Sequence, residues 1–179
     1  MTTVRTAPTH EVGADRLRAV RLMLDTAFDG DFSDDDWDHT LGGVHAWIED
    51  ARGIAAHGAV IQRRVLHRGR SYRVGYVEGV AVREDVRRRG LGGAVTAELE
   101  RVIDGTYPFG ALGASDDGAA LYRARGWQVW PGRLEALGPS GTVRLAEEEG
   151  CVFLRPAAGR ALPGPDAALV FDWRDGDVM

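Results

Sequence analysis

The segment from Gly75 to Gly93 constrains the fold of this chain more than any other part of the sequence. Residues 75–82 read GYVEGVAV, and valines in an alternating run are typical of a β-strand. Gly79 interrupts that alternation and predicts a β-bulge. The following residues, RRRGLGG from Arg87, predict a tight glycine turn that opens a helix with an apolar face at Leu91, Val95, Leu99, Val102 and Ile103. Such a strand, turn and helix N-terminus present backbone N–H groups to an anion, typically a phosphate.

A second motif lies downstream. Residues 119–127 read AALYRARGW and predict a helix that contains Tyr122. Gly126 suits the left-handed position that ends such a helix. Taken alone, the Arg-x-x-Gly-x-Gly pattern fits an Arg-rich surface turn equally well, so its meaning depends on this second motif.

The bulged strand, the glycine turn and the Leu-Tyr-x-x-x-Gly-aromatic segment together resemble the GCN5-related N-acetyltransferase (GNAT) superfamily over roughly residues 15–155. Five further segments resemble the aminoglycoside 2'-N-acetyltransferases of mycobacteria and their relatives: 30–32, Trp37, 39–43, 75–82 and 172–178. The resemblance implies an α/β GNAT fold with a mixed, mostly antiparallel central sheet, flanking helices and a bulged central strand. Residues 1–179 would form a single acetyltransferase domain.

Composition excludes several classes of function. The net charge of −5 argues against a general nucleic-acid binder. All 22 positively charged residues are arginines, so Schiff-base chemistry and a Walker-type phosphate lysine are excluded. A single cysteine excludes an intrachain disulfide and a multi-cysteine zinc site, and the five histidines show no metal-ligand spacing. We therefore expect no metal cofactor.

Two expectations concern the remaining special segments. Cys151 begins the apolar run 151–154, which predicts a buried structural thiol. The N-terminal residues Met1–Arg5 include no apolar signal-peptide region, and no run approaches membrane-spanning length. We expect a cytoplasmic protein with no membrane or nucleic-acid partner.

The other elements follow from periodicity and turn residues. A helix is expected over 15–28 with Leu17, Val20, Leu24, Ala27 and Phe28 on one face, and Ser33 is expected to cap a second helix with Asp36 in the reciprocal position. A first strand or a loose end is expected within 1–14. The predicted strands are 44–50 and 53–66, a meander continuing to 83, then 107–112, 127–130, 151–154 and 169–173.

Charge is segregated along the chain. Residues 25–50 hold no arginine but nine carboxylates: Asp25, Asp29, Asp31, Asp34, Asp35, Asp36, Asp38, Glu49 and Asp50. Residues 63–89 hold nine arginines: Arg63, Arg64, Arg68, Arg70, Arg73, Arg83, Arg87, Arg88 and Arg89. An acidic region suits a polycationic amine, and a basic turn suits the phosphates of coenzyme A. Helix capping alone also explains Asp34 and Asp35.

The resemblance implies acetyl-CoA as the donor. Its expected contacts are Val80, Ala81, Val82, Arg87, Arg88, Arg89, Gly90, Leu91, Gly92, Gly93, Ser115 and Tyr122. Ser115 is included because it is the one polar side chain after the strand 107–112 that could bond the pantetheine arm, and that contact is left open.

Acetyl transfer to an amine needs a proton acceptor, an oxyanion donor and a proton for the departing thiolate. We assign the Val80 N–H to the thioester oxygen. Glu78 would take the amine proton, directly or through water, although an outward-facing strand glutamate is the alternative. Tyr122 would donate its phenolic proton to the thiolate, with a packing role in its helix as the alternative.

The acceptor would meet acidic residues and the tail of the chain. Asp31 is expected to contact the amino sugar by resemblance. The complete set expected at the acceptor is Asp31, Asp36, Glu78, Gly79, Glu147, Glu148, Asp177 and Met179.

The sequence therefore favours an acetyl-CoA-dependent N-acetyltransferase that modifies the 2'-amino group of aminoglycoside antibiotics by direct transfer and so confers resistance. Two alternatives stay open. One is a GNAT acetyltransferase for a polyamine, a peptide or another metabolite amine, and the other is a non-catalytic CoA-binding module. Superfamily analogy also suggests a homodimer.

Overall fold

A computed structural model describes residues 3–179, apart from the side chains of Asp116 and Asp117; Met1 and Thr2, part of the N-terminal segment considered above, lie outside it. The chain divides into two compact units. The first unit comprises the chain up to Ile61 together with Val77–Val102, and the second comprises Gln62–Tyr76 together with Ile103–Met179. Whether 1–179 acts as a single domain stays a prediction.

The first unit combines strands with four helices among the described residues. Its elements are β1 (Arg5–Pro8), α1 (Thr9–Val12), α2 (Ala14–Ala27), α3 (Asp34–Thr40), β2 (Val44–Asp50), the first part of β3 (Gly53–His67), the last part of β4 (Arg70–Val82), the 3-10 turn η1 (Glu84–Val86) and most of α4 (Leu91–Thr106). The predicted helix 15–28, the strands 44–50 and 53–66 and the helix after the glycine turn are all confirmed within a few residues.

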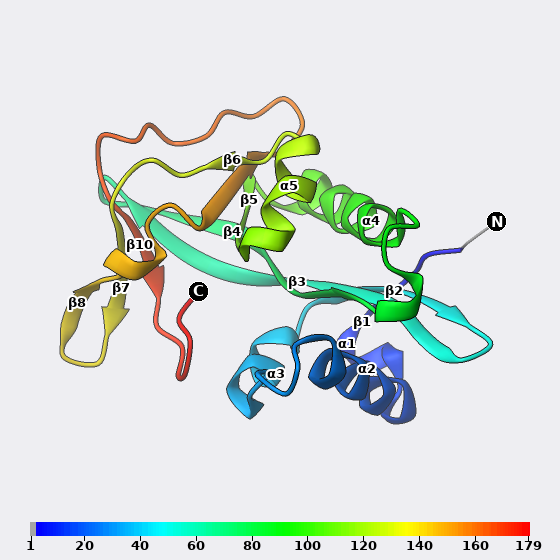
Figure 1. The fold of residues 1–179 in the computed structure, drawn as a ribbon. Helices are drawn as coiled ribbons and strands as arrows, with labels where there is room; N and C mark the ends of the chain where they lie inside the picture. Colours follow the sequence, from blue (N-terminus) through cyan, green and yellow to red (C-terminus); the bar gives the residue numbers. More distant parts are fainter. Residues whose placement is uncertain (1–2) are drawn as a thin grey trace. The chain divides into compact units, whose positions relative to one another are not determined.

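Strands β1, β2 and β3 pair antiparallel in the first unit, and the β2–β3 register runs from Val44 opposite Val60 to Asp50 opposite Gly53. Helices cover both faces of these strands (Figure 1). Val20 and Leu24 of α2 pack with Trp47 on one face. On the other face α4 approaches so closely that a Cβ at Gly58 would lie 2.9 Å from Leu99 Cδ1.

Local chemistry fixes the ends of α3. Ser33 Oγ accepts a hydrogen bond from the Asp36 N–H at 3.1 Å, and Asp36 Oδ2 accepts one from the Ser33 N–H at 2.8 Å. This reciprocal pair is the capping box that the sequence predicts. At the other end, Thr40 is fully buried.

Gly79 has a left-handed backbone within β4, with φ of 55°. This conformation breaks the regular pleat where the sequence predicts a bulge. A Cβ there would lie 3.2 Å from both Cγ2 and Oγ1 of Thr40. Both the backbone angle and the close neighbour therefore require glycine at this position.

A chain of buried polar groups ends on the same glycine. Thr9 Oγ1 lies 2.9 Å from His45 Nε2, His45 Nδ1 lies 2.9 Å from His57 Nε2, and His57 Nδ1 lies 2.9 Å from the Gly79 carbonyl oxygen. Both imidazoles have no exposed surface. We call these four residues the histidine chain. Burial lowers the pKa of His45 to about 4, and burial together with repulsion from His45 lowers the pKa of His57 to about 3.

The second unit is built on a longer set of strands and one further helix within its described part. Its elements are the remainders of β3, β4 and α4, then β5 (Phe109–Gly113), α5 (Asp116–Ala124), β6 (Gln128–Val129), β7 (Leu134–Gly138), β8 (Gly141–Arg144), the turn η2 (Ala146–Glu148), β9 (Val152–Pro156) and β10 (Leu169–Asp172).

The strand order in the second unit is β6-β9-β5-β4-β3-β10-β7-β8. Strand β4 pairs parallel with β5, β10 pairs parallel with β7, and the other pairings of described strands given by the structure are antiparallel. The core holds Tyr76, Phe109, Phe153 and Phe171, all at most 1% exposed. A mixed, mostly antiparallel sheet with flanking helices confirms the predicted fold class.

Arg63 anchors the C-terminal segment of the second unit. Its guanidinium is buried, donates from Nε to Asp172 Oδ1 and from NH2 to the Asp172 carbonyl, and donates from NH1 to the Val178 carbonyl, each at 2.7 Å. The same group stacks on the rings of Tyr76 and Phe171 at 4.8 and 5.0 Å. The tail is thereby folded back onto the sheet.

The structure corrects three sequence expectations and adds one element that the sequence does not predict. Phe28 is 39% exposed and stacks on Phe32, because the apolar face of α2 ends one residue earlier at Ala27. Cys151 is exposed rather than buried, since it belongs to a turn and the buried part of β9 begins at the next residue. The predicted strand 127–130 shrinks to the two residues of β6, and the hairpin of β7 and β8 was not expected.

We expect Gly79→Ala to lower the free energy of unfolding by about 1–3 kcal/mol, because alanine meets both a left-handed backbone and Thr40. Gly69→Ala is the matched control: its φ is 73°, and an added Cβ there would have no neighbour within 4 Å. It should cost about 1 kcal/mol. Gly105→Ala in α4, also without a neighbour, should be neutral or stabilising. Urea unfolding measures all three, and equal effects at 79 and 69 would contradict the role of Thr40.

The lowered pKa values of His45 and His57 make stability depend on pH. Below their ordinary value of 6.5 the unfolded chain takes up protons that the folded chain refuses, so the free energy of unfolding should fall as pH falls from 6.5 to 5. Each histidine contributes up to about 1.4 kcal/mol per pH unit.

The doubly substituted His45→Asn, His57→Asn protein should lose that slope whatever its absolute stability. Glu148 acts in the opposite direction, because burial, Asp177 and Glu147 raise its pKa, but its effect is common to both proteins. Urea titrations at several pH values measure the difference between the slopes. Parallel slopes would contradict the assignment.

Candidate active site

The first unit places Glu78, Gly79 and Val80 at the irregular point of β4, and all three are half-buried. In a trans peptide the carbonyl of one residue and the N–H of the next point in opposite directions. The Gly79 carbonyl accepts from His57, so the Val80 N–H is directed to the other side of the strand. Donation by the Val80 N–H to a thioester oxygen stays a prediction.

Arg83 fixes the end of β4. Its N–H donates to the Ala55 carbonyl at 2.9 Å, and its guanidinium donates to Asp50, Asp85 and the Ile54 carbonyl. Bonds to Asp50 and then Asp85 raise the pKa of Arg83. The strand therefore passes into η1 at a defined position, and the glycine turn follows immediately.

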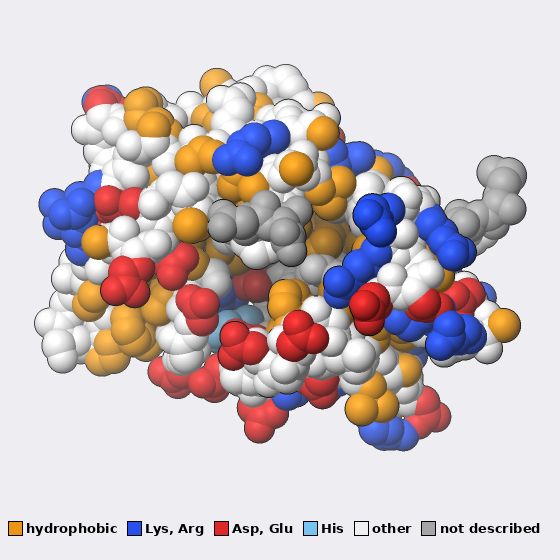
Figure 2. All heavy atoms as spheres, in the orientation of Figure 1, with side chains coloured by type: hydrophobic (Ala, Val, Ile, Leu, Met, Phe, Trp, Pro, Cys, Tyr) orange, Lys and Arg blue, Asp and Glu red, His pale blue; other side chains and the backbone are white. Residues whose placement is uncertain are grey.

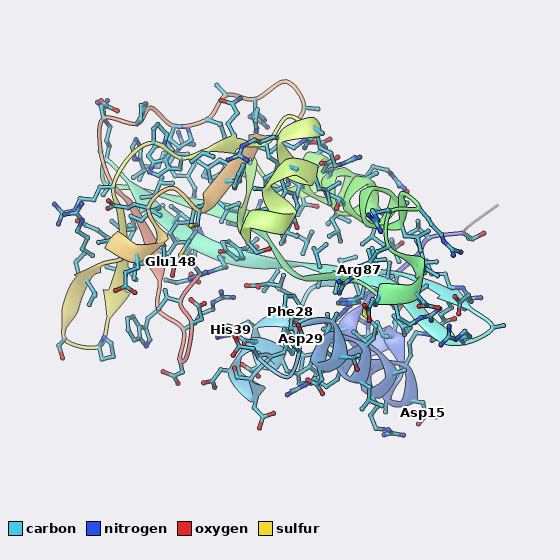
Figure 3. All side chains as sticks on the ribbon, in the orientation of Figure 1. Asp15, Phe28, Asp29, His39, Arg87 and Glu148 are labelled. Atoms are coloured by element: carbon cyan, nitrogen blue, oxygen red, sulfur yellow. The ribbon has the colours of Figure 1, made fainter. Side chains whose placement is uncertain are left out.

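The turn before α4 contains two left-handed residues, Arg88 with φ of 60° and Gly90 with φ of 79°. Arg87 is exposed, but its guanidinium bonds the backbone: its Nε donates to the Val82 carbonyl at 3.1 Å, and its NH2 donates to the Ala27 carbonyl at 3.4 Å, near Phe28 (Figure 3). Arg89 donates to the Asp85 carbonyl at 3.4 Å. The side chains at 87 and 89 thus hold the turn in place.

The turn meets the needs of a diphosphate. α4 begins at Leu91, and the first N–H groups of a helix have no partner within the helix. Gly90, with no side chain, adopts the φ that the turn needs, and the exposed Arg88 adds positive charge beside it. A hollow of about 480 Å³ adjoins the turn; it is lined by Arg89 and Leu91, but also by the carboxylates of Glu49 and Asp50, so it does not itself favour an anion. Binding of the coenzyme A diphosphate by residues 87–93 stays a prediction.

Many of the acids of the segment 25–50 are paired with arginines. Asp25 and Asp34 bond Arg21, and bonds to these two carboxylates raise the pKa of Arg21. Glu49 bonds Arg5 and Arg16, and Asp50 bonds Arg83. Segregation of charge along the sequence is therefore only partly preserved in the fold.

The remaining acids of this segment keep a cation-attracting surface. Figure 2 shows acidic side chains gathered over α3. Asp31 is exposed, and none of the described residues forms a salt bridge with it. Asp36 is half-buried and uses Oδ2 in the capping box. Through Thr40, which contacts the position of Gly79, the helix that carries Asp36 adjoins the irregular point of β4.

The second unit holds Tyr122 and Ser115 on α5. Tyr122 is 6% exposed, and its ring packs against Trp127 at 5.9 Å and Phe153 at 6.3 Å. This packing fixes the direction of the phenol. Ser115 is the N-cap of α5, and its Oγ accepts from the Gly118 N–H at 3.4 Å. The hydroxyl that is predicted to bond the pantetheine arm thus also caps α5.

The second unit brings together three of the predicted acceptor acids. Burial, then Asp177, then Glu147 raise the pKa of Glu148, which is labelled in Figure 3. Met179 is tied to this group, because its N–H donates to Asp177 Oδ1 at 3.1 Å. Met179 also packs on the core of this unit. Like-charged carboxylates in one place favour a bound cation.

The arginines of the segment 63–89 are divided between the two units. Arg83 and residues 87–89 lie in the first unit. Arg64, Arg70 and Arg73 lie in the second, where they line a cavity of about 360 Å³ with Tyr107 and Arg160. The basic turn expected from the sequence therefore consists of the arginines at 87–89, and the cavity-lining arginines belong to the second unit.

Sequence reasoning missed the residues that support these groups. Thr40 and His57 contact Gly79, and Arg63 holds the tail. The sequence around His57 could have predicted its burial, because His57 lies within a run of small residues on a predicted strand. No cluster of His, Cys, Asp and Glu that could hold a metal ion exists in the described part of the chain. Nor does that part include a helix with the length and apolar character needed to cross a bilayer.

Comparison with known proteins identifies relatives of this arrangement. The family described as Acetyltransferase (GNAT) domain matches residues 8–130. An aminoglycoside 2'-N-acetyltransferase from Mycolicibacterium fortuitum is 45% identical over 179 residues, which cover 98% of this chain and 91% of the relative.

Solved structures agree on the fold. The GNAT family N-acetyltransferase YhbS from Escherichia coli, crystallised in complex with CoA, superposes with a TM-score of 0.66 at 17% identity and covers 95% of this chain and 89% of its own. A GNAT family acetyltransferase from Brucella melitensis, in complex with acetyl-CoA, gives a TM-score of 0.61 at 15% identity with coverages of 94% and 96%. With its left-handed break in β4, its glycine turn and these relatives, the chain belongs to the GNAT acetyltransferase family.

Proposed function

We propose that this protein transfers the acetyl group of acetyl-CoA directly to the 2'-amino group of aminoglycosides and thereby confers resistance. The observation that carries the proposal is the 45% identity to an aminoglycoside 2'-N-acetyltransferase across almost the whole chain. Loss of one ammonium charge weakens a polycation's attraction to phosphates, which gives a physical reason for resistance.

In the proposed reaction the turn at 87–93 binds the diphosphate, and Val80, Ala81 and Val82 bind the pantetheine arm as an added strand does. The Val80 N–H donates to the thioester oxygen as negative charge develops there. Ser115 is a further proposed contact to the arm. Backbone donors that are already in place lower the barrier without reorganisation at the moment of reaction.

Glu78 is proposed to take the proton that the ammonium must lose, directly or through water. The neutral amine then attacks the carbonyl carbon, the carbon–sulfur bond breaks, and Tyr122 donates its phenolic proton to the thiolate. The acetylated nitrogen then loses its second proton, which returns through water to the Tyr122 phenolate, and Glu78 releases its proton to solvent. The net reaction frees one proton and needs no acyl-enzyme. No metal is needed in this sequence of steps.

The acceptor is proposed to be held by carboxylates, because an aminoglycoside carries several ammonium groups. Asp31 and Asp36 of the first unit and Glu147, Glu148 and Asp177 of the second are the proposed contacts, with Gly79 and Met179. The raised pKa of Glu148 fits this role, since a bound ammonium would stabilise its charged form. A cytoplasmic location and a homodimer stay predictions.

Regiospecificity tests the proposal directly. Tobramycin has an amine at the 2' position and kanamycin A has a hydroxyl there, so thiol release from acetyl-CoA should occur with the first and be absent with the second. Mass spectrometry and NMR of the product should place one acetyl group on the 2' nitrogen. Equal turnover of the two drugs, or faster turnover of spermidine than of tobramycin, would contradict the proposal and favour another amine acceptor.

Two substitutions test the assigned proton transfers. Glu78→Gln and Tyr122→Phe should each lower kcat by about 10²-fold or more, while KM for acetyl-CoA stays within about twofold. Glu84→Gln and Tyr107→Phe are matched controls within the same two units and should keep full activity. A wild-type protein that binds CoA but acetylates no amine would instead indicate a binding module.

A further inference from the structure

The histidine chain of Thr9, His45, His57 and Gly79 has only one consistent arrangement of hydrogens when both rings are neutral. A carbonyl oxygen only accepts, so His57 Nδ1 must carry the proton that faces Gly79. His57 Nε2 is then an acceptor, and His45 Nδ1 must donate to it. His45 Nε2 is in turn an acceptor, and Thr9 Oγ1 donates its hydrogen to it at 2.9 Å in preference to the Gly43 carbonyl oxygen at 3.2 Å.

The far end of the chain agrees with this direction. Thr9 Oγ1 also receives the Gly42 N–H at 2.9 Å, so its lone pair is occupied from that side. Every donor in the series therefore points towards Gly79. The lowered pKa values of His45 and His57 keep both rings neutral at physiological pH. Hydrogen bonds aligned in one direction polarise one another.

The end point of this alignment matters because the Gly79 carbonyl and the Val80 N–H belong to the same peptide group. A donor on the carbonyl oxygen draws electrons from the amide nitrogen and makes its N–H a stronger donor. The same bond also holds the plane of a peptide whose glycine has a left-handed φ. Both effects act on the one N–H that the proposed function assigns to the thioester oxygen.

We propose that His57, supported by His45 and Thr9, is a positioning residue for acetyl transfer: it polarises and orients the peptide between Gly79 and Val80 from the buried side of β4. This inference rests on the proposed function for the role of Val80. His57 touches neither donor nor acceptor and acts only through that peptide. Its effect is therefore expected on kcat and not on the binding of either substrate.

A set of substitutions at position 57 separates the hydrogen bond from packing. In His57→Asn the amide nitrogen takes the place of Nδ1 and still donates to Gly79, whereas in His57→Gln it takes the place of Nε2 and faces His45. We expect kcat to fall about tenfold in His57→Leu and His57→Gln, and by less than about threefold in His57→Asn, with both KM values unchanged.

His67→Leu is the matched control. His67 is also buried on β3 and its Nδ1 lies 3.2 Å from a backbone carbonyl oxygen, that of Ala168, but it belongs to the second unit and is not part of the histidine chain. It should retain kcat when it is folded. Equal losses of kcat in His57→Leu and His67→Leu, or equal losses in His57→Asn and His57→Gln, would overturn the inference.

Nitrogen-15 NMR of the wild-type protein tests the arrangement without any substitution or acceptor. Both His45 and His57 should be protonated at Nδ1, and the Val80 amide proton should move upfield in His57→Leu but not in His57→Asn. Protonation of either ring at Nε2 alone would overturn the inference. If these spectra hold but the wild type fails to acetylate tobramycin, the proposed function fails and the polarised chain stands.

Discussion

The left-handed backbone of Gly79 is the constraint on which the first unit's site depends. A left-handed φ has a conformational cost in free energy, which is small only for glycine. The contact with Thr40 and the hydrogen bond from His57 hold Gly79 in this conformation. The trans peptide directs the next N–H, that of Val80, away from the side on which His57 bonds the Gly79 carbonyl. Gly79 thus contacts the end of α3 and the buried imidazole of His57 on β3, which in turn bonds His45 on β2, and its strand leads to the glycine turn. Substitutions in these elements should therefore affect the conformation at Gly79.

Every permanently positive side chain in this protein is an arginine, and the structure uses these arginines in three different ways. Arg21 and Arg83 form ion pairs with carboxylates that would otherwise attract a bound cation. Arg87 and Arg89 bond backbone carbonyls and shape the turn, so the proposed diphosphate would meet backbone N–H groups and the exposed Arg88 there. Arg63 serves the core. The number of charges in a segment therefore says little about the field that a ligand meets, and the pairing of each charge decides it.

Much of the fold could be predicted from the sequence, because local rules and tertiary packing agree: the capping box at Ser33, the meander from Val44 and the helix after Gly90 follow from residue types at fixed spacing. The position of the break at Gly79 was also predictable. Long-range polar contacts were not. No local sequence pattern predicts that Arg63 packs against the ring of Tyr76, or that His45 forms a hydrogen bond with His57 on the neighbouring strand. The exposure of Cys151 was missed because an apolar neighbourhood in sequence does not fix where a turn ends.

Arg63 also has a consequence for the order in which the chain can fold. Its partners Asp172 and Val178 lie 109 and 115 residues further along the chain. A protein emerges from the ribosome at about 5–20 residues per second, so this guanidinium waits seconds for its acceptors. During that interval a charged group destined for the interior stays hydrated. The part of β3 around Arg63, which belongs to the second unit, can therefore be fully buried only near the end of synthesis, which makes this one of the last events in forming that unit.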